Sequence, residues 1–371
     1  MKKVGIICEY NPLHNGHVHH FNEVKKQSNA DLVVLSLSSS FTQRGDLAII
    51  DKFTRTELAL EMGVDLVIEC PTIFCMNDAK TFAYYHVRNL SLAGCEEIWI
   101  GSESNNPDLY KEYHNLINTN DFKVTLNEYL NDGYSLKIAF SKSLESFNLS
   151  PLPSNDLLGL FYYEAILEIN PSIKLKTIQR VNARYDEESK VSGDIQSATY
   201  IRDNLKEFKK YVPNFSHNLT YLNADKLFKY IKYAILTNNN LHLLNEANEG
   251  IENRLKDVHK LYNYNELVSY LSTKRYSMTK IKRLLANVLL NMTKTDLANA
   301  QKDSPYIRVL GFNSNGKTLL SELKKDVTIY TNIKEGINTS LDFEMNVSKI
   351  LSSIYKFDLI SNEQEGPKRK M

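Results

Sequence analysis

The first hundred residues alternate short apolar runs with longer stretches in which apolar positions recur at helical spacing. The apolar runs predict four buried strands, which are Val4–Cys8, Leu32–Leu37, Asp65–Glu69 and Glu97–Gly101. The intervening stretches predict three helices, at Gly16–Asn29, Asp51–Gly63 and Asp78–Ala93. Apolar strands joined by helices are typical of a parallel sheet covered on both faces, with ligands bound outside the carboxyl ends of the strands.

The next hundred residues extend the same domain. Helices are predicted at residues 108–117, 121–130, 136–146 and 155–169, and a fifth strand is predicted at Leu175–Gln179. Ser197 is expected to cap a further helix that runs through Arg202 to about Tyr211. We therefore expect residues 1–212 to form one Rossmann-like α/β domain.

The remaining chain has a different pattern. Residues 213–223 resemble a linker and residues 224–300 lack strand signals, which predicts a mainly α-helical region over 213–300. Residues 301–371 contain two further candidate strands, Ile307–Gly311 and Val327–Tyr330, and we expect a small C-terminal α/β lobe there. The basic tail, Pro367–Lys370, is expected to be flexible.

The composition is that of a folded globular protein, with 371 residues, of which 42% are hydrophobic and 24% charged. No apolar run approaches the ~20 residues of a membrane-spanning helix, and the first apolar segment is shorter than the ~7 to 15 residues of a signal peptide. The four cysteines form no CxxC pair. These features predict a cytoplasmic protein with reduced thiols and no membrane contact.

The net charge of +1 conceals a gradient, because residues 1–185 carry a charge of −5 and residues 186–371 a charge of +6. A basic C-terminal half indicates an anionic partner, with nucleic acid the first candidate. A merely solvated basic surface explains the same charge equally well.

The turn between the first strand and the first helix carries the strongest chemical signal, Glu9-Tyr-Asn-Pro-Leu-His-Asn-Gly-His17. A helix N-terminus offers unpaired N–H groups and partial positive charge, and Gly16 lets a phosphate approach the main chain. His14 and His17 are three residues apart, so both imidazoles can donate to one phosphate. The pair predicts stabilisation of charge at an attacked α-phosphate, although two ordinary surface histidines would have the same spacing.

A second segment, Ser197-Ala-Thr-Tyr-Ile-Arg202, joins a helix cap to an arginine suited to distal phosphates. With the His14-Asn-Gly-His17 tetrad it resembles the paired signatures of the nucleotidylyltransferase superfamily. That resemblance implies a HUP-type α/β domain at which the α-phosphate of ATP is attacked and pyrophosphate leaves.

Longer strings narrow the resemblance; they are residues 8–17, 40–46, 65–69 and 154–159, together with Ile201-Arg202. Over essentially the whole chain the sequence resembles the bacterial tRNA(Met) cytidine acetate ligase family. The resemblance implies that acetate and ATP give acetyl-adenylate, whose acetyl group passes to the wobble cytidine of elongator tRNA(Met) and forms N4-acetylcytidine. Leu13 and Asp46 stand where Phe and Glu are usual, which bears on the substrate pocket more than on the reaction.

The resemblance also implies the ATP site, in which His14 and His17 are the catalytic residues. The ATP-binding residues that it implies are Ile7, Cys8, Glu9, Tyr10, Asn11, Pro12, Leu13, His14, Asn15, Gly16, His17, Val18, His19, His20, Gly101, Asn155 and Arg180, and the second signature adds Ser197 and Arg202. These positions gather at the carboxyl edge of the predicted sheet. Taken singly, Gly101 also suits a turn, Asn155 a helix cap and Arg180 a surface charge.

The loop after the second strand opens at the same edge of the sheet. Gln43, Arg44 and Asp46 in this loop are candidates to hold acetate or the incoming cytosine, and the fork of Arg44 suits a carboxylate. An Arg-Gly-Asp turn fixed by a local ion pair is the competing interpretation.

The segment from Lys274 to Arg283 carries five basic residues and no acid, beside an apolar stripe at helical spacing. We expect the stripe to pack inward and to leave a cationic face for tRNA phosphates. The candidate tRNA-binding residues are Lys274, Arg275, Tyr276, Lys280, Lys282 and Arg283. Tyr276, with Tyr270, is a candidate to stack on unpaired bases, although a solvated helix face would show the same pattern.

No metal ligand set is evident. Glu9 lies near the expected phosphates, where a carboxylate suits Mg²⁺, and ATP chemistry implies that ion, but the sequence assigns no ligand. No other cofactor, no general base and no obligate protein partner is assigned.

Two other functions remain open. A small-molecule adenylyltransferase, of the pantetheine-phosphate or nicotinate-mononucleotide type, would need only the first 210 or so residues, and the basic helical half argues against it. A tRNA-binding protein that keeps a nucleotide pocket without catalysis is the other alternative. Acetate-dependent release of pyrophosphate separates the ligase from both.

Overall fold

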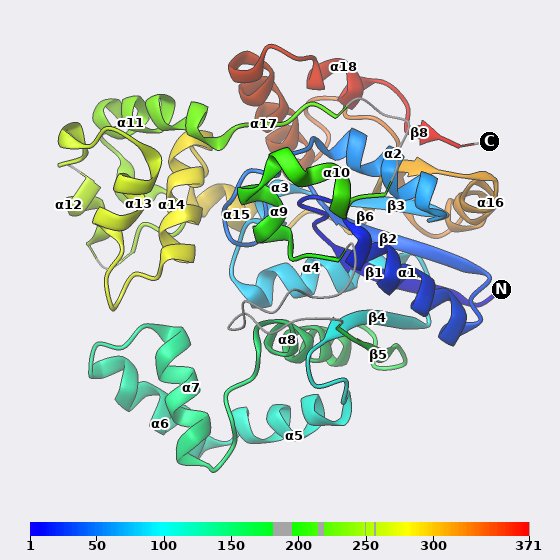
Figure 1. The fold of residues 1–371 in the computed structure, drawn as a ribbon, viewed down its shortest axis with the longest axis horizontal. Coiled ribbons are helices and arrows are strands. Elements are labelled where there is room, and N and C mark those ends of the chain that lie inside the picture. The colour runs from blue at the N-terminus through cyan, green and yellow to red at the C-terminus, as the bar shows by residue number, and fades with distance from the viewer. Residues whose placement is uncertain (181–194, 214–218, 249, 256, 371) are drawn as a thin grey trace.

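A computed structural model describes residues 1–180, 195–213, 219–248, 250–255 and 257–370. An eight-stranded sheet lies at its centre, in the order β5-β4-β1-β2-β3-β6-β7, with β8 paired to β6 (Figure 1). The strands are β1 Lys3–Cys8, β2 Leu32–Ser38, β3 Leu66–Cys70, β4 Glu97–Ser102, β5 Lys174–Gln179, β6 Tyr306–Phe312, β7 Thr328–Tyr330 and β8 Lys368–Arg369.

The five strands predicted in the first half all form, and they pair in parallel. β1 is central, since Ile6 pairs with Leu35 of β2 on one side and with Trp99 of β4 on the other. The chain runs from β1 toward β2 and β3, and then returns to β4 and β5 on the opposite side. The carboxyl end of β1 is therefore the point at which the strand order reverses, where ligands bind in folds of this kind.

Helices join these strands, and their boundaries follow from capping. Asp51 accepts from the N–H groups of Phe53 and Thr54, and Gly63, with φ of 111°, ends the same helix. The helices before β5 are α1 Asn15–Ser28, α2 Lys52–Met62, α3 Thr72–Cys75, α4 Ala79–Leu92, α5 Asp108–Ile117, α6 Asn120–Asn131, α7 Leu136–Ser146 and α8 Ser154–Ile169. α4 and α8 pack on each other and on the sheet, while α6 and α7 form a hairpin that projects from it (Figure 1).

The helix predicted from Ser197 to Tyr211 is broken. It forms three short elements instead, α9 Ala198–Asp203, η1 Leu205–Glu207 and α10 Phe208–Tyr211. Asn204 leaves the helical region, with φ of −124° and ψ of 49°. Its side-chain amide donates to the carbonyl of Tyr200, the local bonding by which asparagine competes with a helix. Residues 214–218 of the predicted linker lie outside the described residues.

The described part of residues 224–300 is helical, as predicted. Its elements are η2 Ala224–Leu227, α11 Phe228–Thr237, η3 Leu241–Leu243, α12 Ile251–Leu255, η4 Val258–Lys260, α13 Tyr264–Leu271, α14 Met278–Leu290 and α15 Lys294–Ala300. We call this part the helical region; it lies to one side of the sheet (Figure 1). None of the helices in the described residues is long and apolar enough to cross a membrane.

The C-terminal segment adds to the central sheet and makes no sheet of its own. β6 pairs antiparallel with β3, β8 pairs with β6, and the helices around them are α16 Ser314–Leu323, α17 Thr339–Tyr355 and α18 Leu359–Gln364. This pairing differs from the expected separate lobe, because the outer edge of β3 needs a partner for its backbone groups. The tail also differs from the expectation: Lys370 donates to the carbonyls of Leu60 and Glu61.

Five buried charged residues bind this segment to the sheet, and we call them the buried ion cluster. They are Lys52 of α2, Glu69 of β3, Arg308 of β6, Glu344 of α17 and Glu363 of α18, each at most 1% exposed. The Lys52 ammonium contacts all three carboxylates, and the Arg308 guanidinium lies 3.3 Å from Glu363 and 3.8 Å from Glu69. Burial raises the pKa of Glu69 to about 7 against the opposing effect of Lys52.

Candidate active site

The two histidines after β1 cap the helix that they begin. Nδ1 of His14 accepts from the N–H of Gly16 at 3.1 Å, and Nδ1 of His17 accepts from the N–H of His14 at 3.3 Å. Each Nδ1 is thus an acceptor, so in the neutral rings the proton sits on Nε2. Both Nε2–H groups are donors that can meet a phosphate oxygen.

The rings of His14 and His17 lie together, with centroids 3.8 Å apart. Burial lowers the pKa of His14 to about 4, and Arg180 and Arg202 act in the same direction. Burial, followed by the neighbouring His14, lowers the pKa of His17 well below its usual value. Both rings are therefore neutral donors near pH 7. Gly16 makes the arrangement possible, because a Cβ there would lie 2.9 Å from Cε1 of His14.

The second signature packs against this turn. Nη1 of Arg202 donates to the carbonyl of Asn11 at 2.7 Å, and Ser197 caps α9 by accepting from the N–H of Tyr200 at 3.1 Å. Arg180, at the end of β5, acts electrostatically on both His14 and His17. The structure thus brings the two histidines and two arginines to one place, as the sequence predicts.

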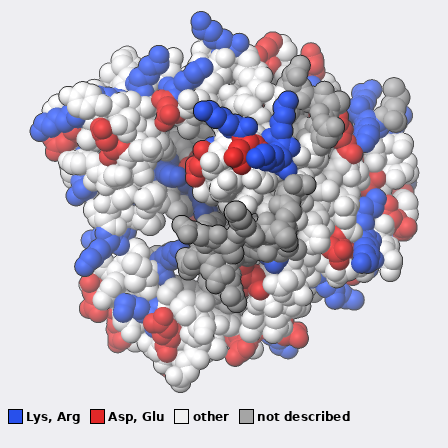
Figure 2. Space-filling model, in the orientation of Figure 1, with Lys and Arg blue, Asp and Glu red and all other residues white. Residues whose placement is uncertain are grey.

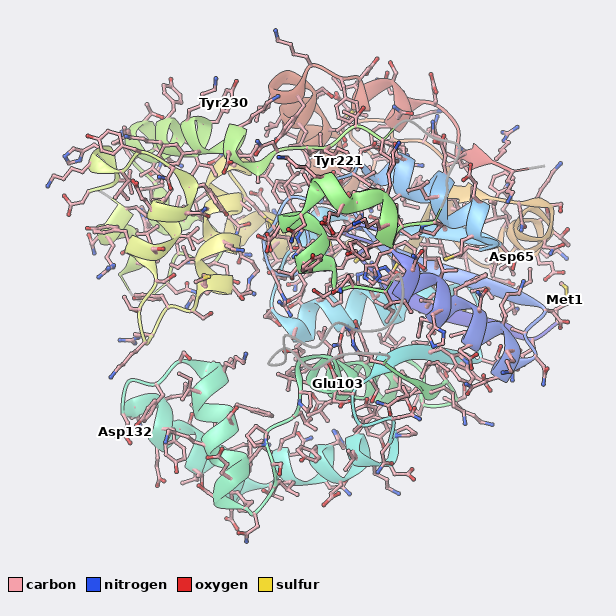
Figure 3. All side chains as sticks on the ribbon, in the orientation of Figure 1. Met1, Asp65, Glu103, Asp132, Tyr221 and Tyr230 are labelled. Atoms are coloured by element: carbon pink, nitrogen blue, oxygen red, sulfur yellow. The ribbon has the colours of Figure 1, made fainter. Side chains whose placement is uncertain are left out.

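Gly101 and Asn155 lie at the neighbouring end of β4. A Cβ on Gly101 would lie 3.4 Å from Cγ of Arg180, so this arginine packs directly beside the end of β4. The amide of Asn155 donates to Glu103 at 2.5 Å, and Nε of Arg180 lies 3.8 Å from the same carboxylate oxygen. Glu103, labelled in Figure 3, therefore joins two predicted ATP contacts. No sequence pattern singled out Glu103, although it comes two residues after Gly101.

Other residues of the predicted ATP segment face the protein interior. Cys8, Tyr10 and Leu13 are at most 9% exposed, so their side chains belong to the protein core in this structure. Asn11 is also buried, and its side-chain oxygen accepts from the N–H of Ile49 at 2.9 Å. Ile7, Glu9, Asn15, Val18, His19 and His20 are partly exposed, while Pro12 is buried. Burial lowers the pKa of His20 to about 4.

A buried arginine that the sequence analysis missed lies behind the site. Arg55 of α2 is 0% exposed, and its guanidinium donates only to backbone carbonyls. Nη1 bonds Glu9 at 2.6 Å and Ser38 at 2.9 Å, Nη2 bonds Ser39 at 2.5 Å, and Nε bonds Ile50 at 2.9 Å. Arg55 therefore ties the end of β1 to the loop that follows β2.

That loop carries the three predicted acetate or cytosine contacts, and the structure gives them separate surroundings. Gln43 donates its backbone N–H to the carboxylate of Glu9 at 2.6 Å and its amide to the carbonyl of Asn77 at 2.9 Å. Arg44 is exposed. Asp46 pairs at 2.8 Å with Lys282 of α14, so the ion pair at this turn involves the helical region and not Arg44.

The predicted cationic face of α14 is only partly a surface. Lys282 contacts Asp46, and Arg283 is 9% exposed and bonds Glu246 at 2.5 Å. Tyr276 is 7% exposed, which removes it as a platform for bases in this structure. Lys274 and Arg275 are exposed, and Lys280 is partly exposed. The apolar stripe packs inward as expected, but α14 also packs against the loop after β2, so its basic residues divide between a contact and a surface.

Comparison with known proteins identifies the family to which the chain belongs. A model of the HIGH nucleotidyl transferase family matches residues 1–366. The tRNA(Met) cytidine acetate ligase of Clostridium perfringens is 38% identical over 95% of each chain, and that of Clostridium novyi is 37% identical over 96% of each. The chain belongs to the tRNA(Met) cytidine acetate ligase family. The resemblance noted in the sequence is thereby confirmed.

Solved structures of two crystal forms match the fold over the whole length of this chain. The crystal structure of apo Thermotoga maritima TmcAL (form I) matches with a TM-score of 0.87 and 26% identity, covering 100% of this chain and 99% of that one. The crystal structure of Thermotoga maritima TmcAL bound with alpha-thio ATP matches with a TM-score of 0.83, 25% identity and the same coverage. The predicted α/β nucleotidylyltransferase fold is confirmed.

Two groups of carboxylates in this chain are candidates to bind a metal ion. In the described residues, the three glutamates of the buried ion cluster lie close enough together to share a metal ion. The Lys52 ammonium already contacts all three, however, and supplies the positive charge that a metal would bring. Glu9 is the better candidate at the ATP site, because its carboxylate lies at the end of β1, where the N–H of Gln43 bonds Oε1.

Proposed function

We propose that this protein is an ATP-dependent ligase that acetylates the wobble cytidine of elongator tRNA(Met). One acetate oxygen attacks the α-phosphorus of ATP, the bond from that phosphorus to the β-phosphate bridging oxygen breaks, and pyrophosphate leaves. N4 of the cytidine then attacks the acetyl carbon, the bond to the AMP oxygen breaks, and the N4 proton passes to water. The observation that carries the proposal is the paired Nε2–H donors at the β1–α1 turn, within a chain of this family.

The first step needs positioning and charge stabilisation. The neutral His14 and His17 donate to the α-phosphate, where negative charge builds as acetate attacks. Arg180 and Arg202 meet the outer phosphates, which turns pyrophosphate into a better leaving group. Gly101 and Asn155, with the 7–20 segment, hold the nucleotide at the reversal point of the sheet.

Acetate and Mg²⁺ are assigned to the rim of the same site. The exposed guanidinium of Arg44 is the candidate acetate contact, because Gln43 and Asp46 already bond Asn77 and Lys282. Glu9 is the candidate to help order Mg²⁺ bound to the ATP phosphates, since the ion keeps few protein ligands when phosphates supply the rest.

The RNA contact is assigned to the exposed basic residues between α13 and α14. Lys274 and Arg275 extend from the helical region, and Lys280 follows at the start of α14. Figure 2 shows the face hollowed between the helical region and the α6–α7 hairpin, with lysine and arginine side chains along the hollow. A polyanion entering there would meet positive charge on its way to the ATP site.

The decisive experiment is nucleoside mass spectrometry of unmodified tRNA incubated with the protein, ATP, magnesium and isotopically labelled acetate. We expect labelled N4-acetylcytidine, and we expect His14→Ala to abolish it. His242→Ala is the matched control, because His242 is an exposed histidine of the helical region.

The outcomes separate the alternatives. ATP cleavage to AMP without label in RNA would support adenylation and contradict RNA as the acceptor. That result favours a small-molecule adenylyltransferase. If neither ATP cleavage nor label is found, the chain is a binding protein and the ligase proposal fails. Release of pyrophosphate that does not depend on acetate would also contradict it.

A further inference from the structure

One face of α11 exposes large side chains that the fold does not use. Ile231 and Ile235 are 1% and 4% exposed and pack inward, where α11 meets α14. On the outer side Tyr230, Tyr233 and Leu236 are 39%, 70% and 54% exposed. They recur every three residues and so lie on one side of the helix. Figure 3 shows Tyr230 on the outer side of α11.

A second segment extends this face. Tyr262, after η4, is 81% exposed, and Nζ of Lys232 lies 5.8 Å from its ring centroid. Lys232 also donates to the carbonyls of His259 at 2.9 Å and Leu261 at 2.8 Å. These bonds hold the segment that carries Tyr262 beside α11. We call Lys229, Tyr230, Tyr233, Leu236 and Tyr262 the α11 strip.

α11 itself carries lysines and no acid, while Glu266 accepts from the backbone N–H of Tyr262 at 2.9 Å. Residues 226–245 contain Lys226, Lys229 and Lys232 and no Asp or Glu. Nζ of Lys229 lies 5.2 Å from the ring centroid of Tyr230, so ammonium and ring are presented together. An isolated exposed tyrosine is ordinary on a protein surface, but aromatic rings at regular spacing with cations beside them have the composition of a surface for single-stranded nucleic acid.

We propose that the α11 strip binds an unpaired segment of the RNA substrate, with bases stacked on Tyr230, Tyr233 and Tyr262 and phosphates beside the lysines. Stacking needs no particular base, so the strip supplies affinity and orientation and leaves the choice of cytidine to the catalytic site. A protein partner would also cover apolar rings. The lysines of α11, which lie beside the exposed rings, favour a polyanion.

The proposal rests on the proposed function, because that function makes RNA the acceptor. It deepens that function by placing a contact outside the α13–α14 segment. α11 packs on α14, and α14 contacts the loop after β2 through Lys282 and Asp46. The strip is therefore connected, through α14, to the loop after β2.

The test compares RNA binding by two double variants, with an unmodified transcript of elongator tRNA(Met) as the probe. Tyr230→Ala/Tyr233→Ala removes both rings and is expected to weaken binding about tenfold or more, whereas Tyr230→Phe/Tyr233→Phe keeps the rings and is expected to bind like the wild type. Lys229→Ala is expected to lower the salt dependence of binding by about one phosphate contact.

Tyr230→Phe/Tyr233→Phe is the matched control, because it keeps both aromatic rings at the same positions of α11. Acetate-dependent pyrophosphate release without RNA should be unchanged in every variant. That readout tests the adenylation proposal separately, so failure of the strip and failure of the proposed function are distinguishable.

Three results would overturn the proposal. RNA affinity that is unchanged in Tyr230→Ala/Tyr233→Ala, or that falls equally in Tyr230→Phe/Tyr233→Phe, would remove the strip as an RNA site. A change in sedimentation without a change in RNA affinity would identify the strip as an interface between copies of the chain. Loss of pyrophosphate release together with RNA binding would show general damage and count against a specific contact.

Discussion

The β1–α1 turn shows how one side chain can cap a helix and keep a second polar group. His14 and His17 use Nδ1 to accept from backbone N–H groups at the helix start that would otherwise lack partners, and this leaves the proton on Nε2. Serine or aspartate would cap a helix as well, but neither side chain has a second polar group that stays free as an uncharged donor, as Nε2–H of the imidazole does. The cap therefore selects the tautomer that the proposed phosphate contact requires.

A proton linkage follows from the lowered pKa values of these histidines. In the protein without ATP, His14 has a pKa of about 4. An ATP phosphate beside the ring would raise this pKa. Between pH 4 and the raised value, the ATP-bound protein therefore holds more protons than the ATP-free protein. We expect ATP binding at pH 5.5 to take up protons, and ATP affinity to rise as the pH falls through this window. Calorimetry in two buffers of different ionisation enthalpy measures the uptake.

The control for this linkage is His14→Gln. The terminal phosphate of ATP also titrates, and its contribution cancels when the variant is subtracted from the wild type. Equal proton uptake by both proteins would contradict the assignment of His14 to a phosphate.

Arg55 leads to a prediction about ATP affinity. Lysine in its place keeps the charge but cannot reach four carbonyls, so the end of β1 and the loop after β2 lose their common tie. We expect Arg55→Lys to raise the dissociation constant for ATP about tenfold or more. Arg308→Lys, which changes a buried arginine of the ion cluster, is expected to reduce stability while ATP affinity stays near the wild-type value. Equal losses of affinity would show that Arg55 acts through stability alone.

Individual residues were predictable where the chemistry is local. The His14-Asn-Gly-His17 tetrad and the Ser197 cap with Arg202 stand in short strings, and the structure brings these strings together. Arg55 and Glu103 were missed because their partners lie in other strings: carbonyls after β1 and β2 for Arg55, and Asn155 for Glu103. A carbonyl acceptor leaves no trace in the sequence.

At the scale of elements, the contact between α14 and the loop after β2 depends on Gly45. A Cβ on Gly45 would lie 2.4 Å from the backbone nitrogen of Arg283, and φ at Gly45 is +82°. We expect Gly45→Ala to separate the loop from α14 and to lower the free energy of unfolding by roughly 2 to 4 kcal/mol, through strain and overpacking. Thermal and denaturant unfolding measure the loss.

Gly133→Ala separates the two causes, because Gly133 has a similar φ of +85° and no atom within 4 Å of its Cβ position. It should cost only the backbone strain, about 1 kcal/mol. If both variants lose the same stability, the close approach of loop and helix contributes nothing.

Elements were predicted well where caps and periodicity agree, as for the five parallel strands and the helices between them. The faces of helices were harder. The periodicity of α14 identified its apolar stripe, but it could not show that Lys282 and Arg283 meet carboxylates of a distant loop and of Glu246. An ion pair across 236 residues of sequence follows from the tertiary fold alone.

At the scale of the whole molecule, the buried ion cluster makes stability depend on pH. Glu69 has a pKa of about 7 in the folded protein, well above its ordinary value of 4.5, so the folded state binds the extra proton between these values. Its contribution to stability is full below pH 4.5 and is lost as the pH rises through 7. In the wild type, the free energy of unfolding should fall by an amount on the order of 3 kcal/mol between pH 5 and 8 because of Glu69, and Glu69→Gln should remove this fall.

The measurement is unfolding as a function of pH for the wild type, Glu69→Gln and the exposed control Glu112→Gln. The buried histidines change stability in the opposite direction, so the difference between the curves isolates Glu69. Parallel curves for the wild type and Glu69→Gln would rule the prediction out. Lys52 and Glu344 of this cluster lie 292 residues apart in the sequence, and no sequence pattern indicated that they meet.

The antiparallel pairing of β3 with β6 has a consequence for how the protein is made. A ribosome releases β3 about 240 residues before β6, so through most of synthesis the outer edge of β3 has its backbone groups unpaired. The nucleotide site can take shape early, but the sheet is complete only when the last segment of the chain emerges. A chain shortened before Tyr306 would keep both sequence signatures and still expose β3 as an unpaired, aggregation-prone edge strand. During translation of the full chain, cells would need to shield the same edge.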